Sequence, residues 1–112
     1  MMINEKLLPQ IENFTNKVTF KETNMLKTIF EKQGNLINIA YGGQAKTHSK
    51  EELIFVLPVG YRPKNSFWVT SQQNTDTSVL MFFNANGNVS VSQISSTSNS
   101  GRIYINVSYF VN

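Results

Sequence analysis

The chain has no cysteine, one histidine and no apolar run long enough to span a bilayer. Without cysteine, it can form neither a disulfide framework nor a thiolate metal site. Its first residues include Glu5, Lys6 and Pro9, where a signal peptide would need an apolar core, so we expect no secretion signal and no membrane partner. At 112 residues, the chain is long enough for one soluble domain with its own core.

Acidic residues are fewer than basic ones, and the formal net charge of +3 would suit a nucleic-acid-binding protein. Such a protein needs several cations on one face to displace the counterions of the phosphate backbone. Here the cations of the first third alternate with acids along the chain: Lys17, Lys21, Lys27 and Lys32 with Glu12, Glu22 and Glu31. We therefore expect no nucleic-acid partner.

Groups that carry catalysis are equally scarce. His48 is the only histidine and Asp76 the only aspartate, and no serine lies in a nucleophile-elbow context. The adjacent Glu51 and Glu52 would point to opposite faces of a strand, whereas a glycosidase needs two carboxyl groups facing one cleft. One histidine and one aspartate cannot fill a transition-metal site without ligands from a second chain. The sequence predicts a non-enzymatic protein without a cofactor, with His48 as a solvated loop residue; calcium held by loop carbonyls stays open.

What the chain does contain is a series of short β patterns separated by turn signals. Alternating or continuous apolar segments predict strands of a few residues each. The expected strands are 18–21, 25–31, 36–41, 53–57, 66–70, 79–83, from 89, and 103–111. Gln33-Gly34-Asn35 and Asn86-Gly87 are typical of hairpin turns. The pattern predicts an all-β fold, an antiparallel two-sheet β-sandwich with jelly-roll-like connections; an immunoglobulin-like sandwich or a small barrel stays open.

The N-terminal residues differ from the remainder. Ile3, Leu7, Ile11 and Phe14 have helical spacing, but Pro9 interrupts it. We therefore expect residues 1–16 to form a short N-terminal arm or linker, and residues 17–112 to form a single β-sandwich domain.

The stretch Leu53–Pro63, LIFVLPVGYRP, carries a resemblance. Its apolar strand closes in LP-x-GYRP, and it is followed by a strand, a strand ending in NG, a strand beginning V-S-V and a terminal alternating strand. In this order, residues 25–112 resemble the C-terminal receptor-binding or fibre-tip domains of tail or baseplate proteins from phages of Gram-positive bacteria. The resemblance implies a binding surface built from loops, and it implies a structural role for the GYRP motif.

The resemblance also implies partners and a location. The expected ligand is a cell-wall polysaccharide or teichoic acid of a Gram-positive host, and the other partners are tail or baseplate proteins. The assembly implied is a homotrimer in the virion, made in the host cytoplasm. The alternative is a purely structural virion protein, for the baseplate or for decoration, that binds only other virion proteins.

Candidate binding residues follow from the chemistry of sugars, whose C–H faces lie on aromatic rings while amides and hydroxyls bond the ring hydroxyls. Uncharged polar loops are predicted at 42–50, 71–77 and 95–101. Trp68 or Tyr104 would be the stacking platform, although Phe67 and Val69 on either side of Trp68 favour a core position for it. The polar candidates are His48, Gln72, Asn74, Asp76 and Arg102.

Overall fold

The computed structural model of the protein describes residues 10–96 and 99–111. These residues form nine strands and one short 3-10 helix: β1 (Ile11–Asn13), η1 (Thr15–Lys17), β2 (Thr19–Phe20), β3 (Lys27–Gln33), β4 (Leu36–Gly42), β5 (Leu53–Val56), β6 (Phe67–Asn74), β7 (Thr77–Phe83), β8 (Asn88–Ile94) and β9 (Tyr104–Phe110). The all-β prediction is confirmed. Within the described part of the chain, no helix is long and apolar enough to cross a membrane.

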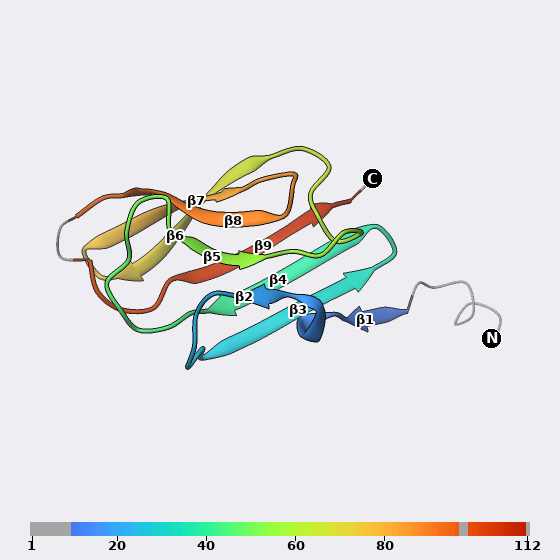
Figure 1. The fold of residues 1–112 in the computed structure, drawn as a ribbon, viewed down its shortest axis with the longest axis horizontal. Helices are drawn as coiled ribbons and strands as arrows, with labels where there is room; N and C mark the ends of the chain where they lie inside the picture. The colour runs from blue at the N-terminus through green and yellow to red at the C-terminus, as the bar shows by residue number, and fades with distance from the viewer. Residues whose placement is uncertain (1–9, 97–98, 112) are drawn as a thin grey trace.

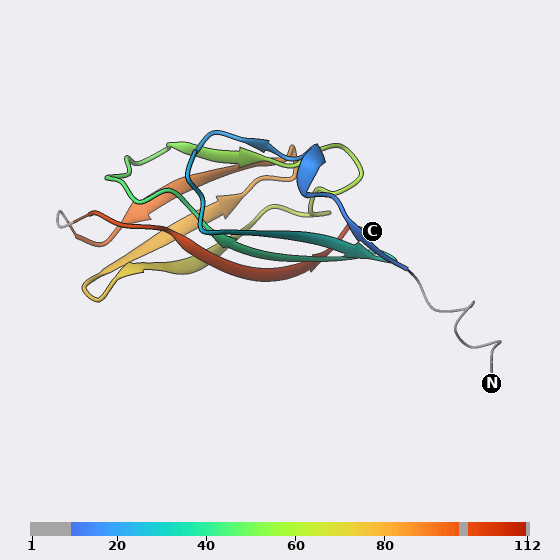
Figure 2. The ribbon, with the colours of Figure 1, turned by 90° about the horizontal axis from the view of Figure 1, so that it is seen from below.

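All strand pairs are antiparallel and belong to one sheet, in the order β1-β3-β4-β9-β6-β7-β8-β5-β2 (Figure 1). The sheet curls, so that β3, β4 and β9 lie along one side of the core and β5, β7 and β8 along the other (Figure 2). The two sides are joined where Gln72 of β6 pairs with Tyr104 of β9. The predicted division into two jelly-roll sheets is therefore not confirmed, because this bridge makes the hydrogen bonding continuous.

Residues 11–20 connect the two edges of the curled sheet. β1 pairs with β3 and forms one edge, and β2 pairs with β5 and forms the other. Between them, Phe14 is fully buried and its N–H donates to the carbonyl of Phe30 at 2.9 Å. The sequence analysis assigned residues 1–16 to an arm, whereas the structure packs residues 11–16 against the domain; residues 1–9 lie outside the described residues.

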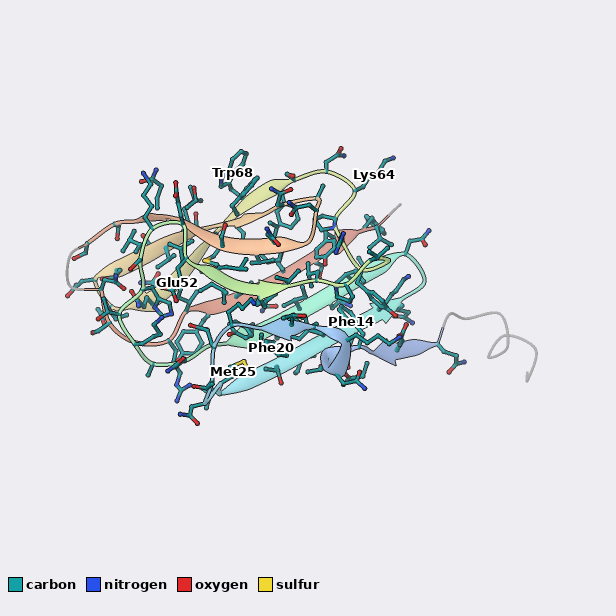
Figure 3. The ribbon with its side chains drawn as sticks, in the orientation of Figure 1. Phe14, Phe20, Met25, Glu52, Lys64 and Trp68 are labelled. Atoms are coloured by element: carbon teal, nitrogen blue, oxygen red, sulfur yellow. The ribbon has the colours of Figure 1, made fainter. Side chains whose placement is uncertain are left out.

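The core is rich in aromatic rings from both sides of the curl. Phe55 of β5 packs edge-on against Phe30 of β3 and Tyr41 of β4, with ring centroids 5.1 and 5.0 Å apart. Phe14 and Phe20, labelled in Figure 3, add rings to this core: both pack on Phe30, and Phe20 also packs on Phe55. Such edge-to-face pairs stabilise a core beyond their buried area. The alternating pattern of the last strand is confirmed, since Ile105 and Tyr109 face this core.

One predicted loop is wrong. Residues 71–77 were expected to be a loop because SQQNTDT is polar, but β6 continues to Asn74 and turns tightly into β7 at Thr77. Ser71 and Gln73 point inward and are buried, while Gln72 points outward. The buried amide of Gln73 bonds His48 and the carbonyl of Gly101, whereas the buried Ser71 hydroxyl has no hydrogen-bond partner among the described residues.

Candidate functional site

Trp68 lies on the outer face of β6 and is 59% exposed. Its ring packs at 4.8 Å and 30° on Phe82, its cross-strand partner on β7. Figure 3 shows the indole pointing away from the sheet. The expectation of a core position was wrong, because Phe67 and Val69 take the inward positions of the strand and alternation turns Trp68 outward.

A groove of about 240 Å³ runs beside the Trp68 ring. Its lining combines two aromatic rings, hydroxyls, an amide and one charge of each sign: Lys50, Glu51, Trp68, Phe82, Ser90, Val91, Ser92 and Gln93. We refer to these residues as the Trp68 groove. A flat apolar platform bordered by hydrogen-bonding groups is suited to a sugar ring, which has both kinds of surface.

Glu51 reaches this groove through an unusual backbone conformation. Its φ is +70°, a left-handed value that a glutamate adopts at a cost of roughly 1–3 kcal/mol. Its N–H donates to the carbonyl of Val91 at 2.6 Å, and the N–H of Val91 donates to the carbonyl of Glu52 at 2.9 Å. These two bonds hold the strained residue against β8, and strain of this kind is concentrated at functional sites.

A buried polar network anchors the segment that brings Lys50 and Glu51 to the groove. His48 is 2% exposed, so the prediction of a solvated loop histidine is wrong. Its Nε2 lies 2.7 Å from Glu22 Oε2, and Gln73 Nε2 lies 3.0 Å from its Nδ1. Gln73 Nε2 also donates to the carbonyl of Gly101 at 3.2 Å, which sets the amide orientation. With that orientation, Nδ1 accepts and Nε2–H donates to Glu22.

Glu22 remains ionised within this network. Burial would raise its pKa, but hydrogen bonds from His48, from the Tyr41 hydroxyl at 2.6 Å and from the Gln44 N–H outweigh burial and lower it. Burial, and then the bond to Glu22, raise the pKa of Tyr41 well above its ordinary value, so the hydroxyl keeps its proton and donates it. The network therefore holds one negative charge that is fully hydrogen-bonded.

Glu22, His48 and Glu52 have potential metal ligand atoms within 4.8 Å of one another. In this structure two of these atoms are hydrogen-bonded to each other, since Glu22 Oε2 lies 2.7 Å from His48 Nε2. Glu52 is engaged elsewhere, with Lys46 Nζ at 2.5 Å and the Ser49 N–H at 2.9 Å. We interpret the cluster as an anchor for residues 43–52.

The other predicted site residues lie away from Trp68. Gln72 is exposed and pairs with Tyr104, which is 47% exposed on the outer face of β9. Asn74 accepts the Asp76 N–H and donates to the carbonyl of Ser100, which stabilises the β6–β7 turn, and Asp76 itself is exposed in that turn.

Arg102, like Asn74, forms hydrogen bonds within the protein that stabilise the fold. Its Nη1 donates to the carbonyls of Asn24 and Gly43, at 2.7 and 2.6 Å. The polar residues predicted for one site thus lie near the end of β6 opposite to Trp68, and the structure does not bring them to its ring.

The sequence reasoning missed the groove residues Lys50, Glu51, Phe82, Ser92 and Gln93. A signal was present: residues 79–83 alternate, and the side chains of Val79, Met81 and Phe83 fill the core, which leaves Phe82 on the outer face. The Val-Ser-Val-Ser pattern of 89–92 likewise places its serines outside.

Comparison with known proteins gives no assignment: no protein-family model matches the chain, and no curated protein matches it.

Proposed function

We propose that the protein is a saccharide-binding module and that the Trp68 groove is its ligand site. The observation that carries the proposal is the exposed indole of Trp68, held flat by Phe82 beside serine hydroxyls and the Gln93 amide. Aromatic platforms of this kind bind the C–H face of a sugar, and the polar border fixes its orientation. The strained Glu51, held at the groove by two backbone bonds, adds a charged acceptor.

The biological setting rests on the resemblance of residues 25–112 to phage fibre-tip domains. In that setting, the protein is a tail or baseplate receptor-binding module of the virion that adheres to a wall polysaccharide or teichoic acid of a Gram-positive host. It acts by binding and not by catalysis. The curled sheet then corresponds to a jelly-roll-like sandwich, and three copies assemble with other tail or baseplate proteins. The purely structural virion protein remains the competing function.

The test is retention of the protein on purified Gram-positive cell walls. Wild type should be retained, and Trp68→Ala should lose roughly 1–3 kcal/mol of binding free energy, the amount that a stacked aromatic ring contributes in comparable sites. Val59→Ala is the matched control, because Val59 is an exposed apolar side chain outside the groove.

Equal retention of Trp68→Ala and Val59→Ala would mean that the ligand binds outside the Trp68 groove. Absence of retention, together with binding to purified virion proteins, would favour the structural alternative. Thermal unfolding of Trp68→Ala should match that of wild type, since the side chain is mostly exposed.

A further inference from the structure

A second hollow, of about 220 Å³, lies at a different place on the molecule. It is lined by Lys32 near the end of β3, by Gly60 and Arg62 in the connection between β5 and β6, and by Val111 after β9. None of these residues belongs to the Trp68 groove. Two of its four lining residues are cations and none is acidic.

Arg62 is held rigidly at this hollow. Its Nε donates to the carbonyl of Leu57 at 2.9 Å, and its side chain lies against Gly87, where an added Cβ would be 2.5 Å from Nε. Among the described residues, no carboxylate forms an ion pair with it. A guanidinium fixed through Nε presents its remaining N–H groups as a planar fork, which matches the oxygens of a phosphate.

Lys32 adds a second positive charge. Its Nζ donates to the carbonyl of Gly60 at 3.2 Å and lies 5.0 Å from the centroid of the Tyr61 ring. The nearby acid is Glu12, whose Oε2 already accepts from the Tyr61 hydroxyl at 2.6 Å and from Lys17 Nζ at 3.1 Å. The ammonium of Lys32 is therefore held in place by a carbonyl and a ring, and Glu12 is occupied by other donors.

The space between the two cations is open. A Cβ built at Gly60 meets no heavy atom within 4 Å, so this stretch of backbone leaves room for a ligand. We propose that Lys32 and Arg62 form a binding site for a phosphate group. This inference uses residues outside the Trp68 groove and can fail or hold separately from it, and a phosphate-bearing wall polymer would link it to the proposed function.

The test is an NMR titration of the full chain with inorganic phosphate and, separately, with glycerol 3-phosphate, with glycerol as the neutral control. Wild type should show saturable shifts centred on Gly60, Arg62 and Val111. Both Arg62→Gln and Lys32→Gln should bind about tenfold more weakly or worse, since a hydrogen bond to a charged group contributes about that much.

Lys27→Gln is the matched control, because Lys27 lies at the other end of β3 and its loss changes the net charge equally. Equal weakening in this control, or shifts that do not saturate, would overturn the site. If Arg62→Gln does not fold, Lys32→Gln decides alone, since the Lys32 ammonium contacts the Gly60 carbonyl and the Tyr61 ring at the protein surface. A titration with poly(glycerol phosphate) then tells whether the bound phosphate group belongs to a polymer or to a small molecule. Tighter binding of this polymer than of inorganic phosphate indicates a polymeric ligand. Binding of inorganic phosphate alone indicates a small phosphate-containing ligand.

Discussion

At the scale of single residues, the Glu22 carboxylate is the charged centre of the buried polar network. It accepts hydrogen bonds from Tyr41 of β4, from His48 and from the Gln44 N–H. Because His48 in turn contacts Gln73 of β6, one side chain links three distant segments of the chain. A buried charge that loses one of its hydrogen-bond partners destabilises the fold strongly.

We expect Glu22→Gln to lower the free energy of unfolding by roughly 1–3 kcal/mol at neutral pH, since the amide offers one acceptor oxygen in place of two. The pKa of Glu22 is lowered in the folded state. Its contribution is therefore complete above the ordinary glutamate value of about 4.3 and disappears as the pH falls through the folded value. Urea unfolding of both proteins across this range should show curves that converge on acidification.

Glu12→Gln provides the control for this prediction. Glu12 also pairs with a lysine and a tyrosine, but at the surface, where such a pair contributes little. A loss in Glu12→Gln as large as in Glu22→Gln, or a constant gap between wild type and Glu22→Gln at all pH values, would contradict the assigned role of the network.

His48 shows why this network could not be predicted. Its sequence neighbours are polar, which is typical of a solvated loop, and its partners Glu22 and Gln73 are 26 and 25 positions away. Trp68 differs, because the alternation of Phe67, Trp68 and Val69 already places the indole opposite to its neighbours. Its exposure could have been predicted from the period of the strand alone.

At the scale of elements, the two strongest turn signals of the sequence pack against each other. The Leu57 N–H donates to the carbonyl of Gly87 at 2.8 Å, and Arg62 of the GYRP motif lies on the same glycine. The Tyr61 carbonyl accepts the hydroxyl of Tyr109 at 2.6 Å, which ties the connection to β9. The connection after β5 and the β7–β8 hairpin thus form one unit with the last strand.

Gly87→Ala should test this unit. Gly87 has a φ of +100°, and an added Cβ would lie 2.5 Å from both Leu57 O and Arg62 Nε. Backbone strain alone costs roughly 1–3 kcal/mol, and the contact with backbone adds to it. Thermal unfolding should therefore show a larger loss for Gly87→Ala than for Gly60→Ala, whose φ is +95° but whose Cβ meets nothing within 4 Å. Equal losses would mean that the packing between the two turns contributes nothing.

Hairpins were the elements that the sequence predicted best. Gly34 and Gly87, both with positive φ, lie in turns between adjacent paired strands, as their Gln33-Gly34-Asn35 and Asn86-Gly87 contexts indicated. The extension of β6 to Asn74 was not predictable by the same reasoning. Its inward Ser71 and Gln73 are polar, and the partner that the Gln73 amide finds in His48 lies on a distant segment of the chain.

At the scale of the whole molecule, the outer face of β9 carries aromatic rings that no element of residues 10–96 and 99–111 covers. Phe110 is 63% exposed and Tyr104 47% exposed, at opposite ends of the strand. Leu26 is exposed beside Tyr104, and Ile11 is exposed on the edge strand β1. Exposed apolar side chains gathered on one face are typical of an interface.

If three copies assemble through this face, light scattering of the isolated protein should give three times the mass of one chain. Phe110→Glu should then give single chains, because a charge would be buried at the interface, while its far-UV circular dichroism stays unchanged. A wild-type protein that remains a monomer at high concentration would contradict the trimer, and a trimer unaffected by Phe110→Glu would place the interface elsewhere.

Trp68 is the chain's only tryptophan, so its fluorescence reports on the proposed ligand site alone. The most direct test of the account is therefore a tryptophan fluorescence titration of the intact protein with solubilised Gram-positive wall polysaccharide. Stacking of a sugar on the exposed indole removes water from it, so we predict a saturable shift of the emission to shorter wavelength. Retention on cell walls without any change in this emission would contradict the claim that the Trp68 groove binds the saccharide.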